Sequence, residues 1–207
     1  MRRTLPLSAV LAGLGMLGGW AHASDQQILG KSFTVKNPSA AQKRKLTSSA
    51  RALNSAGTIT GDPTISGSAG GAFLTVIAKG THPSAQDFSL PQGTSSSGKP
   101  FWRASGTSGF KYKDRNGDQG PVRTVIIKKT LRGVFNIKVV IRGKNGQLNV
   151  VPPDSGTSGL VTLRIGGGDR YCVQFTDGQM KNVEASLFKV RRPVTAGCSS
   201  PSGAFLD

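Results

Sequence analysis

The chain has 207 residues and a formal net charge of +17, because 27 Lys and Arg stand against only 10 Asp and Glu. Glycine is abundant, with 28 residues, and Glu184 is the single glutamate. Glycine destabilises helices, and Ser and Thr compete for their backbone hydrogen bonds, so this composition argues against long helices and favours short strands joined by tight turns.

Residues 1–23 have the pattern of an export signal peptide. A pair of arginines precedes an apolar run over residues 5–20, and Ala-His-Ala at 21–23 is the small-x-small pattern that signal peptidase cleaves. The run is shorter than the about 20 residues that span a bilayer comfortably. We predict cleavage before Ser24 and a mature protein that is secreted or periplasmic in a bacterium. An uncleaved membrane anchor is the alternative interpretation.

Residues 24–93 form a first predicted β unit. Strand candidates are Phe33 to Lys36 and Ala72 to Ala78, where β-branched or aromatic residues recur. Ser39 to Leu53 is a weak helix candidate that could equally begin a strand. Residues 94–100, rich in Ser and Gly, have the composition of a flexible connector.

Residues 101–198 form a second predicted β unit, followed by a short tail at 199–207. The clearest strand is Phe135 to Arg142, where apolar residues alternate with polar ones as in a half-buried antiparallel strand. An Asn-Gly turn at 145–146 predicts a hairpin, with Leu148 to Val151 as its returning strand. Further strand candidates are 110–113, 123–129, 161–165 and 171–175.

Short sequence patterns recur in the same order in the two units. Phe33 to Asn37 is similar to Phe110 to Asp114, and the strand candidate at 73–77 is similar to the one at 161–165, each after a Gly- and Ser-rich stretch. We interpret this as a duplicated β unit, although the bias in composition alone is an alternative explanation. The predicted fold is therefore an all-β, antiparallel β-sandwich built from two related halves.

The two cysteines, Cys172 and Cys198, are predicted to form one structural disulfide. An even, sparse number of cysteines in an exported chain is typical of a disulfide framework. A redox pair or metal ligands are the alternatives, but the spacing fits neither a Cys-x-x-Cys motif nor a zinc knuckle.

The segments Gly109 to Asp114, Gly120-Pro121, Gly168 to Val173 and Phe188 to Val190, followed by Cys198, resemble an uncharacterised β-rich module of secreted and cell-surface proteins of Gram-negative bacteria. The resemblance covers most of the predicted mature chain and is stronger in its second half. It implies export, a β fold and the disulfide. Because that module has no assigned activity, the resemblance implies no catalytic residues.

No catalytic constellation is evident in the sequence. His82, the one histidine after residue 23, lies in a loop-like Thr-His-Pro-Ser context, and no Gly-x-Ser-x-Gly elbow or phosphate-binding glycine motif is present. We therefore predict a non-catalytic protein without a cofactor. The alternative from another class is a secreted hydrolase that uses turn carboxylates such as Asp114, Asp118 or Asp169.

One turn has a weak resemblance to a calcium loop. Asp114, Asn116 and Asp118 place oxygen atoms at alternate positions, as at the start of an EF-hand loop. However, the glycine expected after Asp118 is absent and Val125 stands where the bidentate Glu would be. A plain hairpin turn is the interpretation that we prefer.

Basic residues on and beside the strand candidates predict an anion-binding sheet face. If the apolar residues of the strands face the core, their basic neighbours point outward and attract polyanions. Tyr112 and Trp102 are candidates for stacking on a ligand. The expected partners are anionic polysaccharide, lipopolysaccharide or extracellular nucleic acid. A solvated surface, or a structural protein assembled through strand edges, are the alternatives. The candidate binding residues are Lys111, Lys113, Lys128, Lys138, Arg142 and Arg164.

Overall fold

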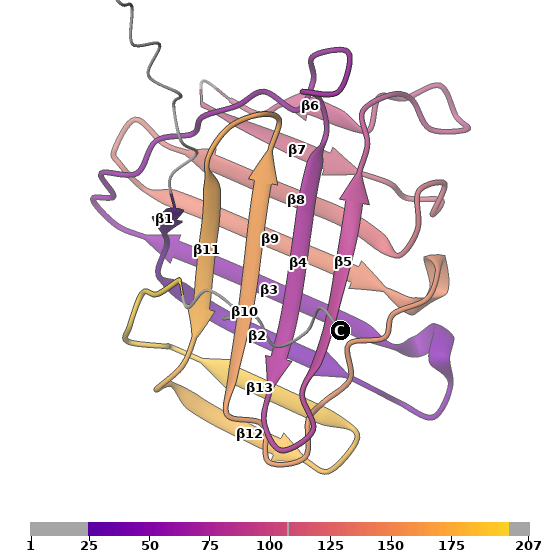
Figure 1. Ribbon diagram of the computed structural model, residues 1–207, viewed down its shortest axis with the longest axis vertical. Helices are drawn as coiled ribbons and strands as arrows, with labels where there is room; N and C mark the ends of the chain where they lie inside the picture. Colours follow the sequence, from indigo (N-terminus) through magenta and orange to yellow (C-terminus); the bar gives the residue numbers. More distant parts are fainter. Residues whose placement is uncertain (1–24, 107, 199–207) are drawn as a thin grey trace, which may run out of the picture.

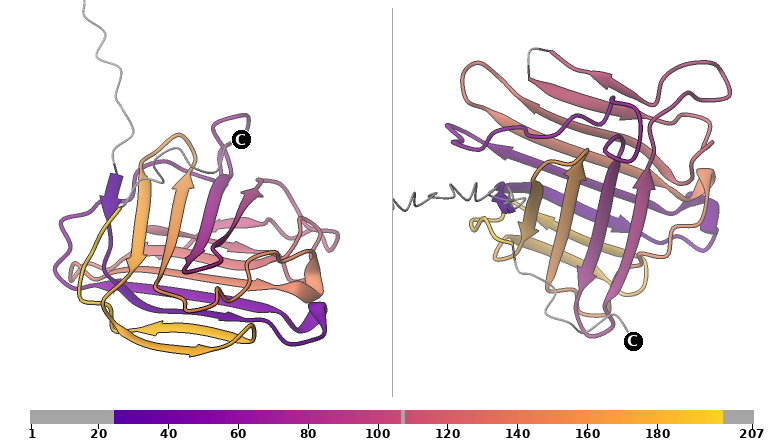
Figure 2. Two further views of the ribbon diagram at one scale, coloured as in Figure 1. Left: turned by 60° about the horizontal axis from the view of Figure 1, so that its bottom comes forward. Right: turned by 45° about the horizontal axis from the view of Figure 1, so that its top comes forward.

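The protein is a sandwich of two β-sheets. A computed structural model describes residues 25–106 and 108–198, in which thirteen strands and two short 3-10 helices are the regular elements. The predicted signal peptide, Ser24 and the predicted tail at 199–207 lie outside the described residues. Figures 1 and 2 show the two sheets face to face, with the strands of one sheet running across those of the other. The prediction of an all-β, antiparallel sandwich is confirmed.

The smaller sheet has five strands in the order β1-β11-β10-β4-β5. All neighbours are antiparallel except β1 and β11, which pair in parallel, so that β1 covers the edge of β11. The bounds of these strands are Asp25–Gln27 (β1), Ala72–Lys79 (β4), Ser84–Leu90 (β5), Ser158–Ile165 (β10) and Arg170–Phe175 (β11).

The larger sheet has eight antiparallel strands in the order β12-β13-β2-β3-β9-β8-β7-β6. It lies behind the smaller sheet in Figure 1. Its strands are Gly30–Lys36 (β2), Lys45–Ala52 (β3), Trp102–Ala104 (β6), Gly109–Lys113 (β7), Val122–Lys129 (β8), Phe135–Arg142 (β9), Gln179–Val183 (β12) and Leu187–Arg191 (β13).

The two predicted halves share both sheets. The smaller sheet combines β1, β4 and β5 of the first unit with β10 and β11 of the second, and the larger sheet places β3 of the first beside β9 of the second. The segments that are similar in sequence lie in the same sheet: β2 and β7 in the larger one, β4 and β10 as neighbours in the smaller one. Residues 94–100 connect strands of one sandwich and not two separate bodies.

The core fills the space between the sheets with alternating side chains from both. In β9, Phe135, Ile137, Val139 and Ile141 are buried, as the alternation predicts. Across the layers, the ring of Phe33 lies 5.3 Å from that of Phe175 in the opposite sheet. Such aromatic contacts fix how the two sheets are seated on one another.

Two predicted elements differ from the structure. The helix candidate at 39–53 is instead the 3-10 helix Ala41–Lys43 (η1) followed by β3, because Leu46, Ser48 and Ala50 alternate inward. The prediction of a returning strand at 148–151 is also wrong, because these residues form no strand.

Residues 148–151 lie outside any ladder because the chain passes here from the larger sheet to the smaller one. The 3-10 helix Gly143–Asn145 (η2) begins this passage. The backbone N–H groups of Asn149 and Val151 donate to side-chain oxygens of Gln86 and Ser84 on the edge strand β5. Side chains thus supply the hydrogen bonds that a strand partner would otherwise give.

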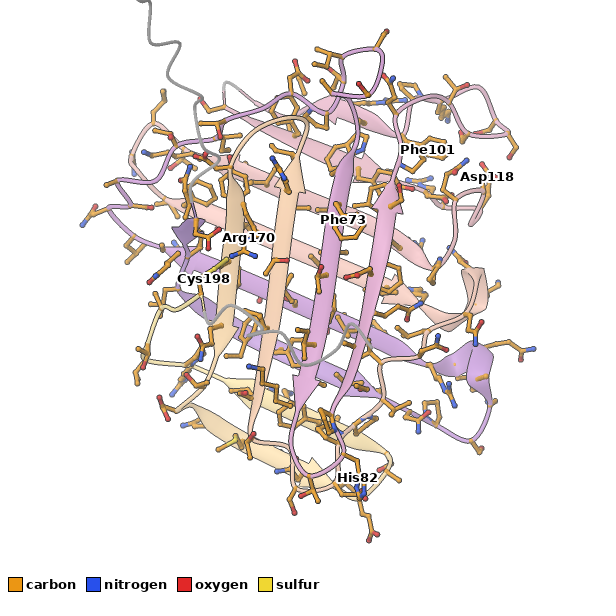
Figure 3. All side chains as sticks on the ribbon, in the orientation of Figure 1. Phe73, His82, Phe101, Asp118, Arg170 and Cys198 are labelled. Atoms are coloured by element: carbon orange, nitrogen blue, oxygen red, sulfur yellow. A yellow bond between two sulfur atoms is a disulfide. The ribbon has the colours of Figure 1, made fainter. Side chains whose placement is uncertain are left out.

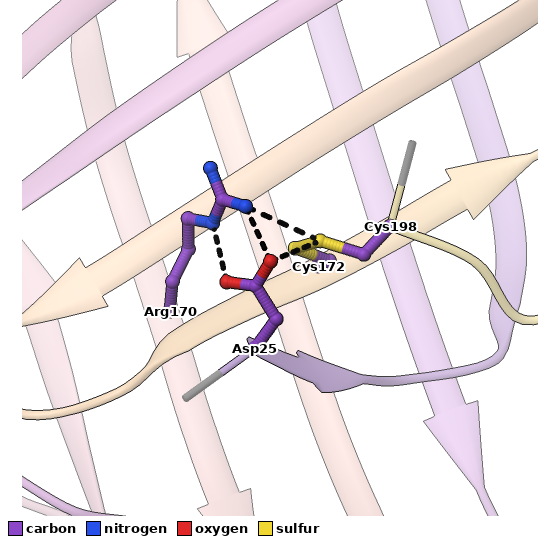
Figure 4. Close-up of a disulfide and its surroundings, with 4 residues drawn as sticks. All are labelled: Asp25, Arg170, Cys172 and Cys198. Atoms are coloured by element: carbon purple, nitrogen blue, oxygen red, sulfur yellow. Dashed lines mark hydrogen bonds and ion pairs between the residues drawn. A yellow bond between two sulfur atoms is a disulfide. The ribbon is translucent and has the colours of Figure 1, made fainter. Parts of the chain in front are cut away.

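The predicted disulfide joins Cys172 on β11 to Cys198, with the Cα atoms 5.2 Å apart. Figure 4 shows it beside an ion pair in which the guanidinium of Arg170 contacts both carboxylate oxygens of Asp25. Disulfides persist in oxidising compartments, so this bond is compatible with a secreted or periplasmic protein. None of the helices in the described ranges has the length and apolar character needed to cross a membrane.

Candidate anion-binding face

The outward-facing positions of the larger sheet carry cations and no acidic residue. Strand alternation and register place Phe33, Leu46, Val139 and their neighbours toward the core, so the residues between them point to solvent. We call this surface the basic face. Its twelve cations come from all eight strands: Lys36, Lys45, Arg51, Arg103, Lys111, Lys113, Lys128, Lys138, Arg142, Lys181, Lys189 and Arg191.

The structure therefore brings five of the six predicted anion-binding residues onto one sheet face. Lys111, Lys113, Lys128, Lys138 and Arg142 lie on β7, β8 and β9. The prediction is wrong for the sixth residue, Arg164. It lies on β10 of the smaller sheet, whose outer face is on the opposite side of the sandwich. There its Nε donates to the carbonyl oxygen of Gly168, 3.3 Å away.

The cations of the basic face are not neutralised within the described part of the chain. The ion pairs among residues 25–106 and 108–198 join His82 to Asp154 and Arg170 to Asp25, and neither involves this face. At Lys189 of β13, partial removal from water, followed by the repulsion of Arg191, Lys36 and Lys181, lowers the pKa of the ammonium group. Binding of an anion to such a surface relieves the repulsion and is therefore favourable.

The basic face ends in a concave corner beside β6 and β7. The loop at 91–101 and the loop at 114–121 meet there, at the upper right of Figure 1. Together with these strands they enclose a cavity of about 420 Å³. We call it the corner pocket; its lining includes five cations, Lys99, Arg103, Lys111, Lys113 and Arg115.

Charge crowding is strongest around Lys113 in the corner pocket. Partial removal from water, followed by the repulsion of Arg115, Lys111, Arg103 and Lys99, lowers the pKa of Lys113. Phe101, which is buried, and Pro100, which is exposed, supply the apolar part of the lining, and the hydroxyl-bearing Ser95 and Ser97 also belong to it. The pocket thus combines convergent cations with a small apolar area.

Hydrogen bonds hold the two loops of the corner pocket together. The carboxylate of Asp118 accepts the backbone N–H of Ser96 at 2.8 Å and the Ser96 hydroxyl at 3.0 Å, and the Asn116 amide donates to the same hydroxyl at 3.2 Å. Figure 3 shows Asp118 close to Phe101 at this corner. Residues 94–100, predicted as a flexible connector, form a closed turn in which the Ser95 N–H donates to the Lys99 carbonyl.

The carboxylate of Asp114 is turned into its own loop. It is fully buried and accepts the backbone N–H groups of Gly117, Asp118 and Gln119 at 2.8, 3.1 and 2.8 Å. The carboxylates of Asp114 and Asp118 therefore accept hydrogen bonds from different groups, and Asn116 uses its amide nitrogen as a donor to Ser96. This is the arrangement of a hydrogen-bonded turn, the interpretation preferred over a calcium loop.

The prediction that Tyr112 and Trp102 stack on a ligand is wrong. Their exposed fractions are 0% and 3%, and their rings pack together in the core with centroids 5.3 Å apart. Burial, followed by the charges of Asp114 and Asp118, raises the pKa of Tyr112. The Trp102 indole N–H donates to the Leu90 carbonyl of β5 and so ties the end of the larger sheet to the smaller one.

The remaining residues considered for catalysis or metal binding lie apart from the basic face. His82 Nδ1 lies 3.1 Å from Asp154 Oδ2 in an exposed pair at one end of the sandwich (Figure 3). Asp169 accepts a hydrogen bond from the Gln26 amide at 2.6 Å. Within the described ranges, Asp25, Cys172 and Cys198 are the one group of three acidic or sulfur ligands close together. Because the cysteines are bonded to each other, their sulfurs are not free thiolates.

Comparison with protein-family models, with curated proteins and with solved structures found no match to this chain.

Sequence reasoning missed Lys99, Arg103 and Arg115 of the corner pocket and all six outward cations on β2, β3, β12 and β13. Lys99, Arg103 and Arg115 stand in short or turn-rich segments without visible alternation, so no pattern pointed to them. For Lys36, Lys189 and Arg191, a signal was present, because Phe33 to Lys36 and Phe188 to Arg191 share a Phe-x-Val-basic pattern. These two segments prove to be neighbouring strands, β2 and β13, on the same face.

Proposed function

We propose that this protein is an exported, non-catalytic protein of the cell envelope or the medium that binds anionic polymers through its basic face. The observation that carries the proposal is the presence of twelve outward cations, and no carboxylate, on the strands of one sheet. Export is supported by the signal-like pattern at 1–23 and by the disulfide.

The dimensions of the basic face suit a chain-like anion. Neighbouring strands are about 4.8 Å apart, so the face extends roughly 34 Å across its eight strands. Cations recur over this whole width, from Arg103 on β6 to Lys181 on β12. An extended polyanion that follows this direction meets several cations at once and releases its condensed counterions.

The buried aromatic residues favour recognition of charged groups over recognition of bases. Stacking of nucleobases needs accessible rings, and Tyr112 and Trp102 offer none. Nucleic acid would therefore bind through its phosphates alone, in the same way as lipopolysaccharide or a sulfated or phosphorylated polysaccharide. We accordingly expect little preference for nucleotide sequence.

The test is the affinity of the purified mature protein for heparin, lipopolysaccharide, polygalacturonate and single-stranded DNA over a series of salt concentrations. We expect log affinity to fall linearly with log salt, with a slope that reports the number of anionic groups contacted. Absence of binding to all four at low salt would refute the proposal.

A second experiment distinguishes the proposed binding protein from the alternative, a secreted hydrolase. Polysaccharide and ester substrates are incubated with the protein and with Asp114→Asn, Asp118→Asn and Asp169→Asn variants. Turnover that one of these substitutions abolishes while the fold is retained would establish an enzyme.

A further inference from the structure

The corner pocket differs from the rest of the basic face because it is concave and its walls come from four segments. β6 and β7 contribute Arg103, Lys111 and Lys113, while the two loops contribute Lys99 and Arg115. On the open sheet, cations are spread along flat strands. At the corner, five of them line one cavity of about 420 Å³, a volume within the usual range of small-molecule sites.

We propose that the corner pocket is a discrete binding site for a compact group carrying several phosphate or sulfate esters, such as one modified sugar unit. This inference rests on the proposed function and deepens it: the basic face holds an anionic polymer, and the pocket selects the type of its charged group. The site would give the protein a point of specific recognition within a surface that is otherwise sequence-independent.

The chemistry of the lining favours tetrahedral oxyanions. A phosphate or sulfate ester presents three outer oxygens in different directions, so it can accept hydrogen bonds from several converging cations, whereas a carboxylate presents two oxygens in one plane. The guanidinium groups of Arg103 and Arg115 provide paired donors in a planar fork, and each of the three lysines provides a compact ammonium group with three rotatable donors. The hydroxyls of Ser95 and Ser97 also line the pocket, where they bond to each other and to the Lys99 carbonyl and so help to hold the loop in shape.

The pocket is also held in shape before any ligand arrives. Asp118 fastens the 91–101 loop through Ser96, and Asp114 organises the 114–121 loop through three backbone N–H groups. The backbone N–H of Lys113 donates to the Phe101 carbonyl at 2.9 Å and connects the strand with the loop. Preorganisation of this kind lowers the entropy cost of binding.

The experiment is calorimetric titration of the mature protein with three compact probes: inositol hexakisphosphate, sucrose octasulfate and benzene hexacarboxylate. We expect saturable one-to-one binding of the phosphate probe, the sulfate probe or both, and much weaker binding of the carboxylate probe. Comparison of the first two shows which ester the site prefers. Equal binding of all three would refute selection for tetrahedral oxyanions.

Two variants test whether the compact probe binds in the corner pocket. They remove the same amount of charge from opposite ends of the basic face. Arg103→Gln/Lys113→Gln changes the corner pocket, and Lys181→Gln/Lys189→Gln is the matched control on β12 and β13. We expect the pocket variant to bind the preferred probe about a hundredfold more weakly, because each charge-assisted hydrogen bond that is removed weakens binding about tenfold. The control should stay within about threefold of wild type, since its cations lie far from the pocket.

The outcomes separate this inference from the proposed function. If both variants weaken the compact probe equally while heparin still binds, the pocket is not a discrete site but the basic face stands as a polymer-binding surface. If wild-type protein binds neither heparin nor the compact probes, both proposals fall. Amide shifts in an NMR titration, expected at 95–99 and 111–116, give the location independently of how well the variants fold.

Discussion

The outer faces of the two sheets differ in how their charges are compensated. The larger sheet presents twelve cations and no acidic residue, whereas the outward positions of the smaller sheet combine Lys79, Arg164 and Arg170 with Asp25 and Asp87. The smaller face also carries the disulfide and the Asp25–Arg170 ion pair. The smaller face therefore holds an internal ion pair, whereas no ion pair among the described residues involves the basic face.

This difference shows that the high net charge is not spread evenly over the surface. A basic protein that needed charge only for solubility would gain as much from cations on either side. On the larger face, partial removal from water and then repulsion by neighbouring cations lower the pKa of both Lys113 and Lys189, which is a cost to the folded state. Functional surfaces commonly carry such a cost in stability.

The largest expected effect is on the smaller face. Reduction of the Cys172–Cys198 bond, or a double change to Ala, should lower the free energy of unfolding by about 3–4 kcal/mol, because the bond closes a loop across a sequence separation of 26 residues. Denaturant unfolding with and without reductant measures the loss. Heparin affinity measured under native conditions should stay the same; a parallel loss of affinity would mean that the two faces are not independent.

The next effect concerns the loop that shapes the corner pocket. Asp114→Asn should lower the free energy of unfolding by about 1.5–3 kcal/mol, because the amide cannot accept all three backbone N–H groups that the carboxylate accepts. Asp87→Asn, on an exposed position of β5, is the control. Denaturant unfolding of the two variants gives the comparison. Equal and small effects of the two substitutions would show that the loop is held by other contacts.

A third prediction tests the contact between the sheets on which both faces depend. A methyl group at residue 159 would lie 2.7 Å from the ring of Phe33, so Gly159→Ala should lower the free energy of unfolding by about 1–3 kcal/mol. Gly167→Ala is the matched control, because no atom lies within 4 Å of the added group there. The unfolding temperatures of the two variants give the comparison. If Gly159→Ala were as stable as Gly167→Ala, the described packing of the two sheets would be contradicted.

The smallest effect is a gain in stability. Lys113→Gln and Lys189→Gln should each be slightly more stable to unfolding than wild type at low salt and neutral pH, because each removes a charge that is partly withdrawn from water and repelled by its neighbours. The folded pKa of each lysine lies below its unfolded value, so the repulsion weakens as the pH rises through the folded pKa. The advantage of the variants should therefore shrink at alkaline pH, and also in high salt. An advantage that is independent of both would contradict charge repulsion as its cause.

The sequence was sufficient to predict the fold class, the disulfide and part of the basic face. Alternation over 135–142 identified β9 because every second residue enters the core, and the same rule placed Lys138 outside. The rule does not say which strands share a sheet, so Arg164, which alternates equally well, was assigned to the wrong side of the sandwich. It also failed at Leu148 to Val151, where alternating burial occurs in a segment bonded to side chains of β5.

The corner pocket was beyond sequence reasoning for a different reason. Its cations come from residues 99, 103, 111, 113 and 115, and they form one cavity only because β6 pairs with β7 and Ser96 bonds to Asp118. Tyr112 and Trp102 show the converse error. Their aromatic character suggested stacking on a ligand, but it is the inward side of the β6–β7 pair that they occupy.

The central claim is that the larger sheet, and not the net charge of the protein, binds polyanions. The direct measurement compares heparin affinity between Lys138→Gln/Lys189→Gln, which changes the basic face, and Lys79→Gln/Arg164→Gln, which removes the same charge from the smaller sheet. At about 0.1 M salt the first should lose roughly one to two orders of magnitude in affinity, and the second should remain close to wild type. Equal losses in the two variants would show that binding follows net charge alone and would contradict the account.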